Sequence, residues 1–327
     1  MNITRRALFG GIAFLATSKI TSAQEMREVT IAVSSGSMAA AVTRIADALG
    51  LFAKHKLVPR NIIMESGNAA TSALISQSVD FAVSGPSELI AVQARGQKVL
   101  AIATAYGSVA GVLVLNKEVA KGLSTDVGSP IAGRLRALDG LLIAAISPTS
   151  ISPLGVRLAA KDVGGNLRYT YMSQEAMPAA LDSGAVQGIL ASAPMWAAPV
   201  SKGTGVRWLN ASEIPYKFRT THAVSLQVMK SFSEQNPDVI KSMVDILNDV
   251  NNAIDNSPAD VKAAISKLFP QIDQPSLDLL YEVEAPLWKS RSISEDDMKH
   301  EIELVKGATV SEDLAKDLDP AAMLYRQ

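Results

Sequence analysis

Residues 78–88 read SVDFAVSGPSE, and they contain the structural unit that repeats along the chain. The apolar run near the start of this stretch predicts a buried strand, and the GPS tripeptide after it is typical of the start of a helix. The same order of strand, small polar residues and helix occurs twice before it, with strands predicted at 29–34 and 60–65. This alternation indicates an α/β fold.

The alternation continues through most of the chain. Short apolar or β-branched runs predict further strands at 99–106, 112–115, 141–146, 167–172, 186–191 and 222–229. After residue 229 the pattern is helical throughout. Three helix starts are predicted there, from Asn236 before Pro237 and from the capping-box pairs Ser257 with Asp260 and Ser294 with Asp297.

Residues 1–23 have the pattern of a secretory signal. Arg5 and Arg6 precede an apolar run of about ten residues, far shorter than the roughly 20 that a membrane-spanning helix needs. The segment ends in small residues at Thr21, Ser22 and Ala23, so we predict cleavage after Ala23 and a periplasmic protein that is not membrane-embedded. The adjacent arginines resemble a twin-arginine export motif, with an ordinary Sec signal as the alternative.

Composition narrows the function further. The sequence contains no cysteine, which excludes disulfides, thiolate metal sites and a lipid-anchored cysteine. The predicted signal carries three basic residues and no acidic one, so its removal changes the formal net charge from −1 to −4. This mild acidity argues against nucleic acid as a partner. The three histidines, His55, His222 and His300, are too far apart in the sequence to suggest a metal site. We expect no metal and no cofactor.

Small polar residues follow the first three predicted strands, at the sheet edge where an open α/β fold binds its ligand. Because they share this edge, the loops are expected to converge on one cleft. Free N–H groups at the helix starts there bind anions or polar groups. Their candidate ligand-binding residues are Ser35, Ser37, Ser66, Asn68, Gly85, Ser87 and Glu88. Helix capping alone would also explain the serines, and Glu88 could complement its own helix N-terminus instead of a basic ligand group.

The loop after the strand at 141–146 carries the densest hydroxyl cluster of the chain, more than helix capping requires. Its candidate ligand-binding residues are Ser147, Thr149, Ser150 and Ser152. Met195 and Trp196 could stack over a planar or apolar ligand, or pack at a hinge or in the core. Tyr106 is a further candidate, beside a crossover between the two halves of the chain.

Three basic residues are candidate partners of a carboxylate or sulfonate, although surface salt bridges are the simpler explanation. They are Arg157, Arg168 and Arg219.

Four stretches together resemble a known family. They are GLFAKHKL at 50–57, SVDFAV at 78–83 with Gly85, LDG at 138–140 before a strand, and LDSGAVQG at 181–188. In this order and spacing the chain resembles substrate-binding proteins of ABC importers. The group includes sulfonate-, taurine- and nitrate-binding receptors and binders of thiamine-pyrimidine precursors. None of the four stretches reports the identity of the ligand.

The resemblance implies a two-lobed periplasmic-binding-protein type II fold, each lobe a mixed sheet flanked by helices, with the ligand cleft between them. Residues 24–110 and 222–327 would form the first lobe, and residues 111–221 the second. It implies a monomeric receptor that delivers a small organic molecule to an ABC permease and its ATPase. Helix N-termini and hydroxyls suit an anionic sulfonate or carboxylate, and Trp196 would allow an aromatic body.

Two other functions share this architecture. Enzymes of thiamine-pyrimidine synthesis and of the menaquinone pathway are similar in fold, but the former carry a cysteine-rich motif and both act inside the cell. The predicted signal and the missing cysteines argue against them. We find no nucleophile elbow, P-loop, HExxH or dinucleotide motif, and therefore predict that the chain is not an enzyme. A ligand-binding partner of a membrane sensor would have the same sequence features.

Overall fold

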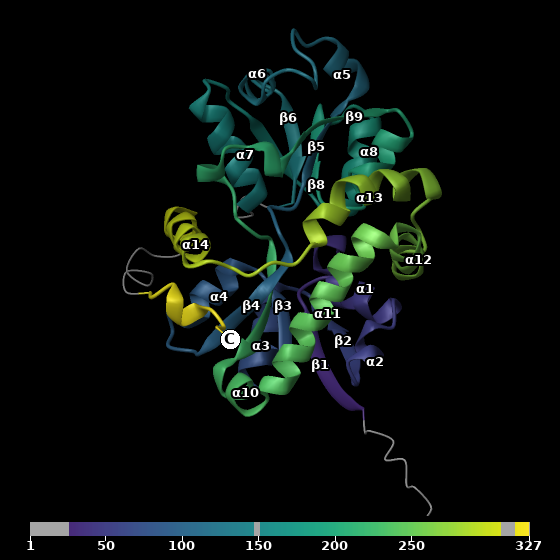
Figure 1. Cartoon of the computed structure of the whole chain (residues 1–327). Helices are drawn as coiled ribbons and strands as arrows, with labels where there is room; N and C mark the ends of the chain where they lie inside the picture. The colour runs from purple at the N-terminus through teal and green to yellow at the C-terminus, as the bar shows by residue number, and fades with distance from the viewer. Residues whose placement is uncertain (1–25, 147–150, 309–317, 327) are drawn as a thin grey trace, which may run out of the picture.

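The computed structural model describes residues 26–146, 151–308 and 318–326. They form two lobes, each built on a five-stranded mixed sheet flanked by helices (Figure 1). This confirms the predicted α/β fold with a mixed sheet in each lobe. The predicted signal at 1–23, with its arginine pair, lies outside the described residues.

The first sheet has the strand order β2-β1-β3-β10-β4. Neighbours β2, β1 and β3 are parallel, whereas β10 runs antiparallel to both β3 and β4. Because β10 follows the second-lobe strands in the sequence, the first lobe consists of two separate segments of the chain. The strands are β1 (Arg27–Val33), β2 (Leu57–Ile63), β3 (Phe81–Ser84), β4 (Val99–Tyr106) and β10 (Val224–Met229).

The second sheet has the order β7-β6-β8-β5-β9, with β5 antiparallel to both β8 and β9. Its strands are β5 (Val112–Asn116), β6 (Leu142–Ala145), β7 (Arg168–Tyr171), β8 (Gly188–Ala191) and β9 (Gly205–Asn210). All strands predicted from the sequence are present, but β9 was not predicted. Its residues GVRWLN show no clear alternation, and pairing with the buried β5 makes them a strand.

Helices cover both sheets. The first lobe carries α1 (Val42–Ala48), α2 (Leu51–Lys54), α3 (Gly67–Ile75), α4 (Pro86–Gln93), α10 (Lys230–Gln235), α11 (Pro237–Asn256) and α12 (Pro258–Leu268). The second carries α5 (Lys117–Lys121), α6 (Ile131–Arg136), α7 (Ile151–Asp162), α8 (Met177–Asp182) and α9 (Ala197–Ser201). Short 3-10 turns occur at Met38–Ala40, Gln174–Ala176, Ala211–Glu213, Tyr216–Phe218 and Ala321–Met323.

One of the three predicted caps forms as expected. Ser294 Oγ accepts from the backbone N–H of Asp297, and the Asp297 carboxylate accepts from the backbone N–H of Ser294, each at 3.0 Å, to begin α14 (Glu295–Ala308). Asn236 and Ser257 stand at helix starts, but neither side chain caps its helix. Both precede a proline, which restricts their backbone, and neither adopts the extended conformation that suits a capping side chain.

Helix α13 (Gln274–Trp288) joins the two lobes. It packs against α9 of the second lobe and against β4, α11 and α12 of the first (Figure 1). The Glu284 carboxylate accepts hydrogen bonds from Tyr106 Oη at 2.6 Å and Trp196 Nε1 at 3.1 Å. All three side chains are buried, within an apolar core that continues from one sheet to the other. The C-terminal helices are predicted to belong to the first lobe, and α13 packs against elements of both lobes.

Helix α14 contacts the chain where it returns to the first lobe. Glu301 Oε1 accepts from the backbone N–H and the hydroxyl of Thr221, at 2.5 and 2.7 Å, and lies 3.8 Å from His222 Nδ1. The side chains of His222 and Glu301 are fully buried. Burial lowers the pKa of His222 to about 4 and raises the pKa of Glu301 to about 7. The folded protein therefore favours the neutral form of both groups near pH 6.

Replacing Gly155 by alanine should destabilise the second lobe. A Cβ at Gly155 in α7 would lie 2.2 Å from the carbonyl oxygen of Phe218, which is backbone and cannot turn away. We expect G155A to lower the free energy of unfolding by on the order of 2 kcal/mol despite the better helix propensity of alanine. The matched control is G133A in α6, where the nearest atom would be 3.7 Å away. Urea unfolding should show that G133A is as stable as wild type or more stable. An equal loss of stability in G155A and G133A would contradict the close packing at Gly155.

The substitution Glu301→Gln should change how stability depends on pH. Between about pH 4.5 and 7 the folded protein keeps a proton on Glu301 that the unfolded chain has released, so wild-type stability loses this contribution as pH rises. Thermal and urea unfolding should show E301Q gaining about 3 kcal/mol relative to wild type between pH 4.5 and 8. The opposite contribution of His222 is present in both proteins and cancels in the difference.

The matched control is Glu303→Gln, which makes the same charge change on the exposed face of α14. E303Q should show no such gain. A difference between E301Q and wild type that stays constant from pH 4.5 to 8 would contradict the buried, protonated state of Glu301.

Candidate functional site

A cleft of about 840 Å³ lies between the lobes and is lined by residues of both. Three helices begin at its edge, α3 and α4 from the first lobe and α7 from the second. In each lobe the cleft lies at the carboxyl ends of parallel strands, because α4 follows β3 and α7 follows β6. This is the position in which open α/β sheets bind ligands.

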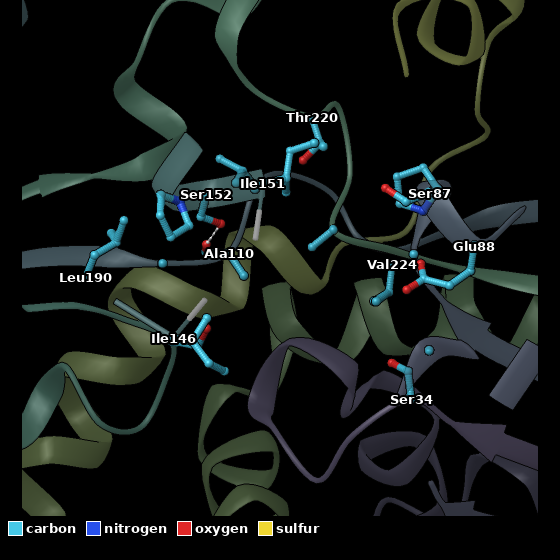
Figure 2. Close-up of a pocket in the computed structure, with 18 of the residues that line it drawn as sticks. Ser34, Ser87, Glu88, Ala110, Ile146, Ile151, Ser152, Leu190, Thr220 and Val224 are labelled. Atoms are coloured by element: carbon cyan, nitrogen blue, oxygen red, sulfur yellow. Dashed lines mark hydrogen bonds between the residues drawn. The ribbon is translucent and has the colours of Figure 1, made fainter. Parts of the chain in front are cut away.

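The first-lobe side of the cleft is polar. It is lined by Ser34 at the end of β1, Asn68 at the start of α3, and Ser87 and Glu88 at the start of α4 (Figure 2). Gln227 of β10 holds the loop before α4, because its Nε2 donates to the carbonyl oxygens of Ser84 and Gly85 at 3.1 and 3.2 Å. Strand β10 thus positions the polar groups of the loop between β3 and α4.

Glu88 is partly buried in the cleft. Burial raises the pKa of its carboxyl group, while its own backbone N–H and that of Gly85 donate to it and lower the pKa. Two glycines make room for the carboxylate. A Cβ at Gly67 would lie 2.6 Å from Glu88 Oε1, and one at Gly85 would lie 2.5 Å from Oε2.

The second-lobe side is mainly apolar. Ile146, Ile151 and Leu190 line it, and Ile146 keeps 48% of its surface exposed (Figure 2). Ser152 also lines the cleft, but its hydroxyl donates to the carbonyl oxygen of Ala110 at 2.6 Å. Gln174 lines it as well and accepts from the backbone N–H of Ser192 at 2.8 Å.

The structure brings five of the predicted residues together around this cleft. They are Asn68, Gly85, Ser87, Glu88 and Ser152. The cleft residues that the sequence analysis missed are mostly apolar or small, and several end predicted strands, as Ile146 and Ala191 do. Their position at the ends of predicted strands is the sequence signal that points to them.

Other predicted residues have local roles outside the lining. Ser35 and Ser37 hydrogen-bond to each other at 2.7 Å, and Ser66 caps α3 by accepting from the backbone N–H of Ala69 at 3.2 Å. Helix capping, the alternative weighed for Ser66, therefore accounts for that residue. The hydroxyls of Ser147, Thr149 and Ser150 lie outside the described residues.

Tyr106 and Trp196 are placed in the core between the lobes, and neither lines the cleft. Their polar atoms are occupied by Glu284, and each side chain is at most 1% exposed. Met195 is half-buried and packs against the same core. For Trp196 the structure shows the hinge or core packing that was weighed against ligand stacking.

None of the three basic candidates lines the cleft. Arg157 donates to Tyr171 Oη at 2.7 Å, Arg168 to the carbonyl oxygen of Gly140 at 3.0 Å, and Arg219 to that of Ile214 at 3.2 Å. Within the described residues these three side chains form hydrogen bonds and not the expected surface salt bridges.

Within the described ranges, no three His, Asp or Glu side chains are grouped closely enough to hold a metal ion. No helix in the same ranges is long and apolar enough to cross a membrane.

Comparison with solved structures supports the fold. The chain is similar to the periplasmic aliphatic sulphonate binding protein SsuA from Escherichia coli, with a TM-score of 0.70, 15% identity, and coverage of 91% of this chain and 97% of that one. It is also similar to the periplasmic nitrate-binding protein NrtA from Synechocystis PCC 6803, with a TM-score of 0.63, 12% identity, and coverage of 90% and 85%. No curated protein sequence matches the chain.

A third similar structure is the alkanesulfonate-binding protein SsuA from Xanthomonas axonopodis pv. citri bound to MOPS, with a TM-score of 0.66, 14% identity, and coverage of 93% and 100%. These likenesses confirm the two-lobed periplasmic-binding-protein fold. A family model described as NMT1-like matches residues 22–269, most of the chain. Fold and family match together confirm the predicted resemblance, and the chain belongs to the NMT1-like family.

Proposed function

We propose that this protein is a periplasmic solute receptor that binds a small organic molecule between its lobes and delivers it to an ABC permease. The observation that carries the proposal is the cleft of about 840 Å³, lined from both lobes at the carboxyl ends of their strands. The similar structures are named as periplasmic binding proteins, and they support the periplasmic location. Export would follow cleavage of residues 1–23, by either route.

In this proposal the lobes, 24–110 with 222–327 and 111–221, close on the ligand. A ligand that touches both lobes only when they meet stabilises the closed state by those extra contacts. Gly111 stands at the crossover with φ of 130°, a conformation that other residues rarely adopt, and its position also lines the cleft. The chain would bend near this residue and near the return at 220–223.

The expected anionic group on the ligand has partial support. Helices α3, α4 and α7 all begin at the cleft, and the N-terminus of a helix favours a carboxylate or sulfonate. The described lining residues include no lysine, arginine or histidine. We therefore propose that an anionic group, where the ligand has one, carries a single charge and is held by backbone N–H groups and hydroxyls.

The cleft offers little support for an enzyme. The three histidines that could act as bases are held elsewhere: His55 against Asp249, His222 in the core beside Glu301, and His300 stacked on Tyr216. Family and fold favour a binding protein. A partner of a membrane sensor would use the same cleft, and genes for a permease and an ATPase beside this one would favour import.

A ligand screen tests the proposed function. Mature protein should be mixed with sulfonates, aromatic carboxylates, nitrate, pyrimidines and amines, and its unfolding temperature measured. Because a ligand at 100 times its Kd stabilises the folded state by about 2.7 kcal/mol, at least one compound should raise that temperature by several degrees. No shift with any compound, together with turnover of one of them, would overturn the receptor function.

Asn68 and Ser66 allow binding to be separated from capping. Asn68 lines the cleft, whereas Ser66 caps the same helix and does not line it. We expect N68A to weaken binding of the best ligand in the screen by roughly tenfold, the worth of one polar contact. S66A should cost about 1 kcal/mol of stability and leave the Kd unchanged. Calorimetric titration of both variants checks this, and equal loss of affinity would contradict the assignment.

A further inference from the structure

The charge inside the cleft is unusual for a site expected to hold an anion. Among the described residues that line it, Glu88 is the sole charged side chain. No ion pair to Glu88 is formed within the described part of the chain. The described lining of the cleft therefore contains one carboxylate and no basic side chain.

The Glu88 carboxylate lies close to the backbone at two glycines. Gly67 and Gly85 lie so close to its two oxygens that no larger residue would fit at either position without displacing it. Figure 2 shows the carboxylate directed toward the space that Ser34 and Val224 also face. The backbone N–H groups of Gly85 and of Glu88 itself lower the pKa of this carboxyl group, against the larger effect of burial, which raises it. Each carboxylate oxygen has two lone pairs, so acceptor capacity remains toward the cleft.

The second-lobe side of the cleft is mainly apolar. Ile146, Ile151 and Leu190 present hydrocarbon from the second lobe, with Pro153 and Val109 beside them. Closing this wall over the first lobe would expel water from Glu88. A carboxylate that loses water without gaining a donor is costly, so a closed receptor needs the ligand to supply one.

We propose that Glu88 is the specificity-determining residue of the site and accepts a hydrogen bond from a protonated amine or similar N–H cation of the ligand. The hydrocarbon part of the same ligand would lie against the apolar wall of the second lobe. The inference rests on the proposed receptor function and narrows its ligand class. Any anionic group would lie away from Glu88, at the N-termini of α3 and α7.

Matched pairs of compounds test this. We would titrate the mature protein by calorimetry with 3-aminopropanesulfonate against propanesulfonate, and with 2-phenylethylamine against 2-phenylethanol. In the first pair an ammonium group takes the place of a hydrogen, and in the second it takes the place of a neutral hydroxyl. Wild type should bind the ammonium compound of at least one pair about tenfold or more tightly than its partner, as hydrogen bonds to charged groups allow.

Glu88→Gln keeps the shape and removes the charge, and should abolish this preference. Glu88→Asp keeps the charge and is the second variant if E88Q does not fold. Glu234→Gln is the matched control, because it removes an exposed carboxylate on α10 and should leave both affinities unchanged. In Figure 1, α10 lies at the end of the first lobe remote from the second.

Three outcomes would overturn the inference: preference for the compound without nitrogen, an ammonium preference that survives in E88Q, or no binding of either pair. The broader screen then decides separately on the receptor function. Binding of a sulfonate, nitrate or carboxylate there would leave the receptor proposal standing and remove only the role assigned to Glu88.

Discussion

The hydrogen bonds of Glu284 hold together the region on which both lobes depend. A buried carboxylate is stable only when donors surround it, and here the two donors come from different lobes, Tyr106 from the end of β4 and Trp196 from the segment before α9. Helix α13 therefore cannot leave either lobe without exposing or stranding a polar group. The apolar core follows the same path, so the two sheets share one packed interior next to the cleft.

The cleft follows from this arrangement. With the lobes joined on one side by α13, the carboxyl ends of the parallel strands of both sheets face the space that remains. The helices that follow those strands begin there and direct their N-termini inward. The two walls differ because the first-lobe loops carry hydroxyl, amide and carboxylate groups, whereas Ile146 follows β6 and Ala191 ends β8. A ligand that fits both walls needs a polar end and a hydrocarbon end.

Buried polar groups also mark the return of the chain to the first lobe. Glu301 of α14 accepts two hydrogen bonds from Thr221, directly after Thr220, which lines the cleft. Its neighbour His222 is equally buried, and burial drives both groups toward their neutral forms. Thus α13 supports the first crossing between lobes and α14 the second. The C-terminal helices therefore support both places where the chain passes between the lobes.

The sequence by itself determined the alternation of strands and helices, the family, and three polar residues on the first-lobe side of the cleft. Asn68, Ser87 and Glu88 could be placed because strand ends and helix starts are local patterns, and their meeting at one edge follows from a parallel sheet. Only the tertiary structure decided the roles of Tyr106 and Trp196. Their partner Glu284 is 178 and 88 residues away in the chain, and local patterns carry no information on such pairs. A hint existed, since Glu284 interrupts the apolar helical spacing of Leu277, Leu280 and Trp288, which predicts a buried carboxylate but not its donors. The strand β9 was hidden for the same reason, because pairing with β5, about ninety residues earlier, determines its conformation more than its own residues do.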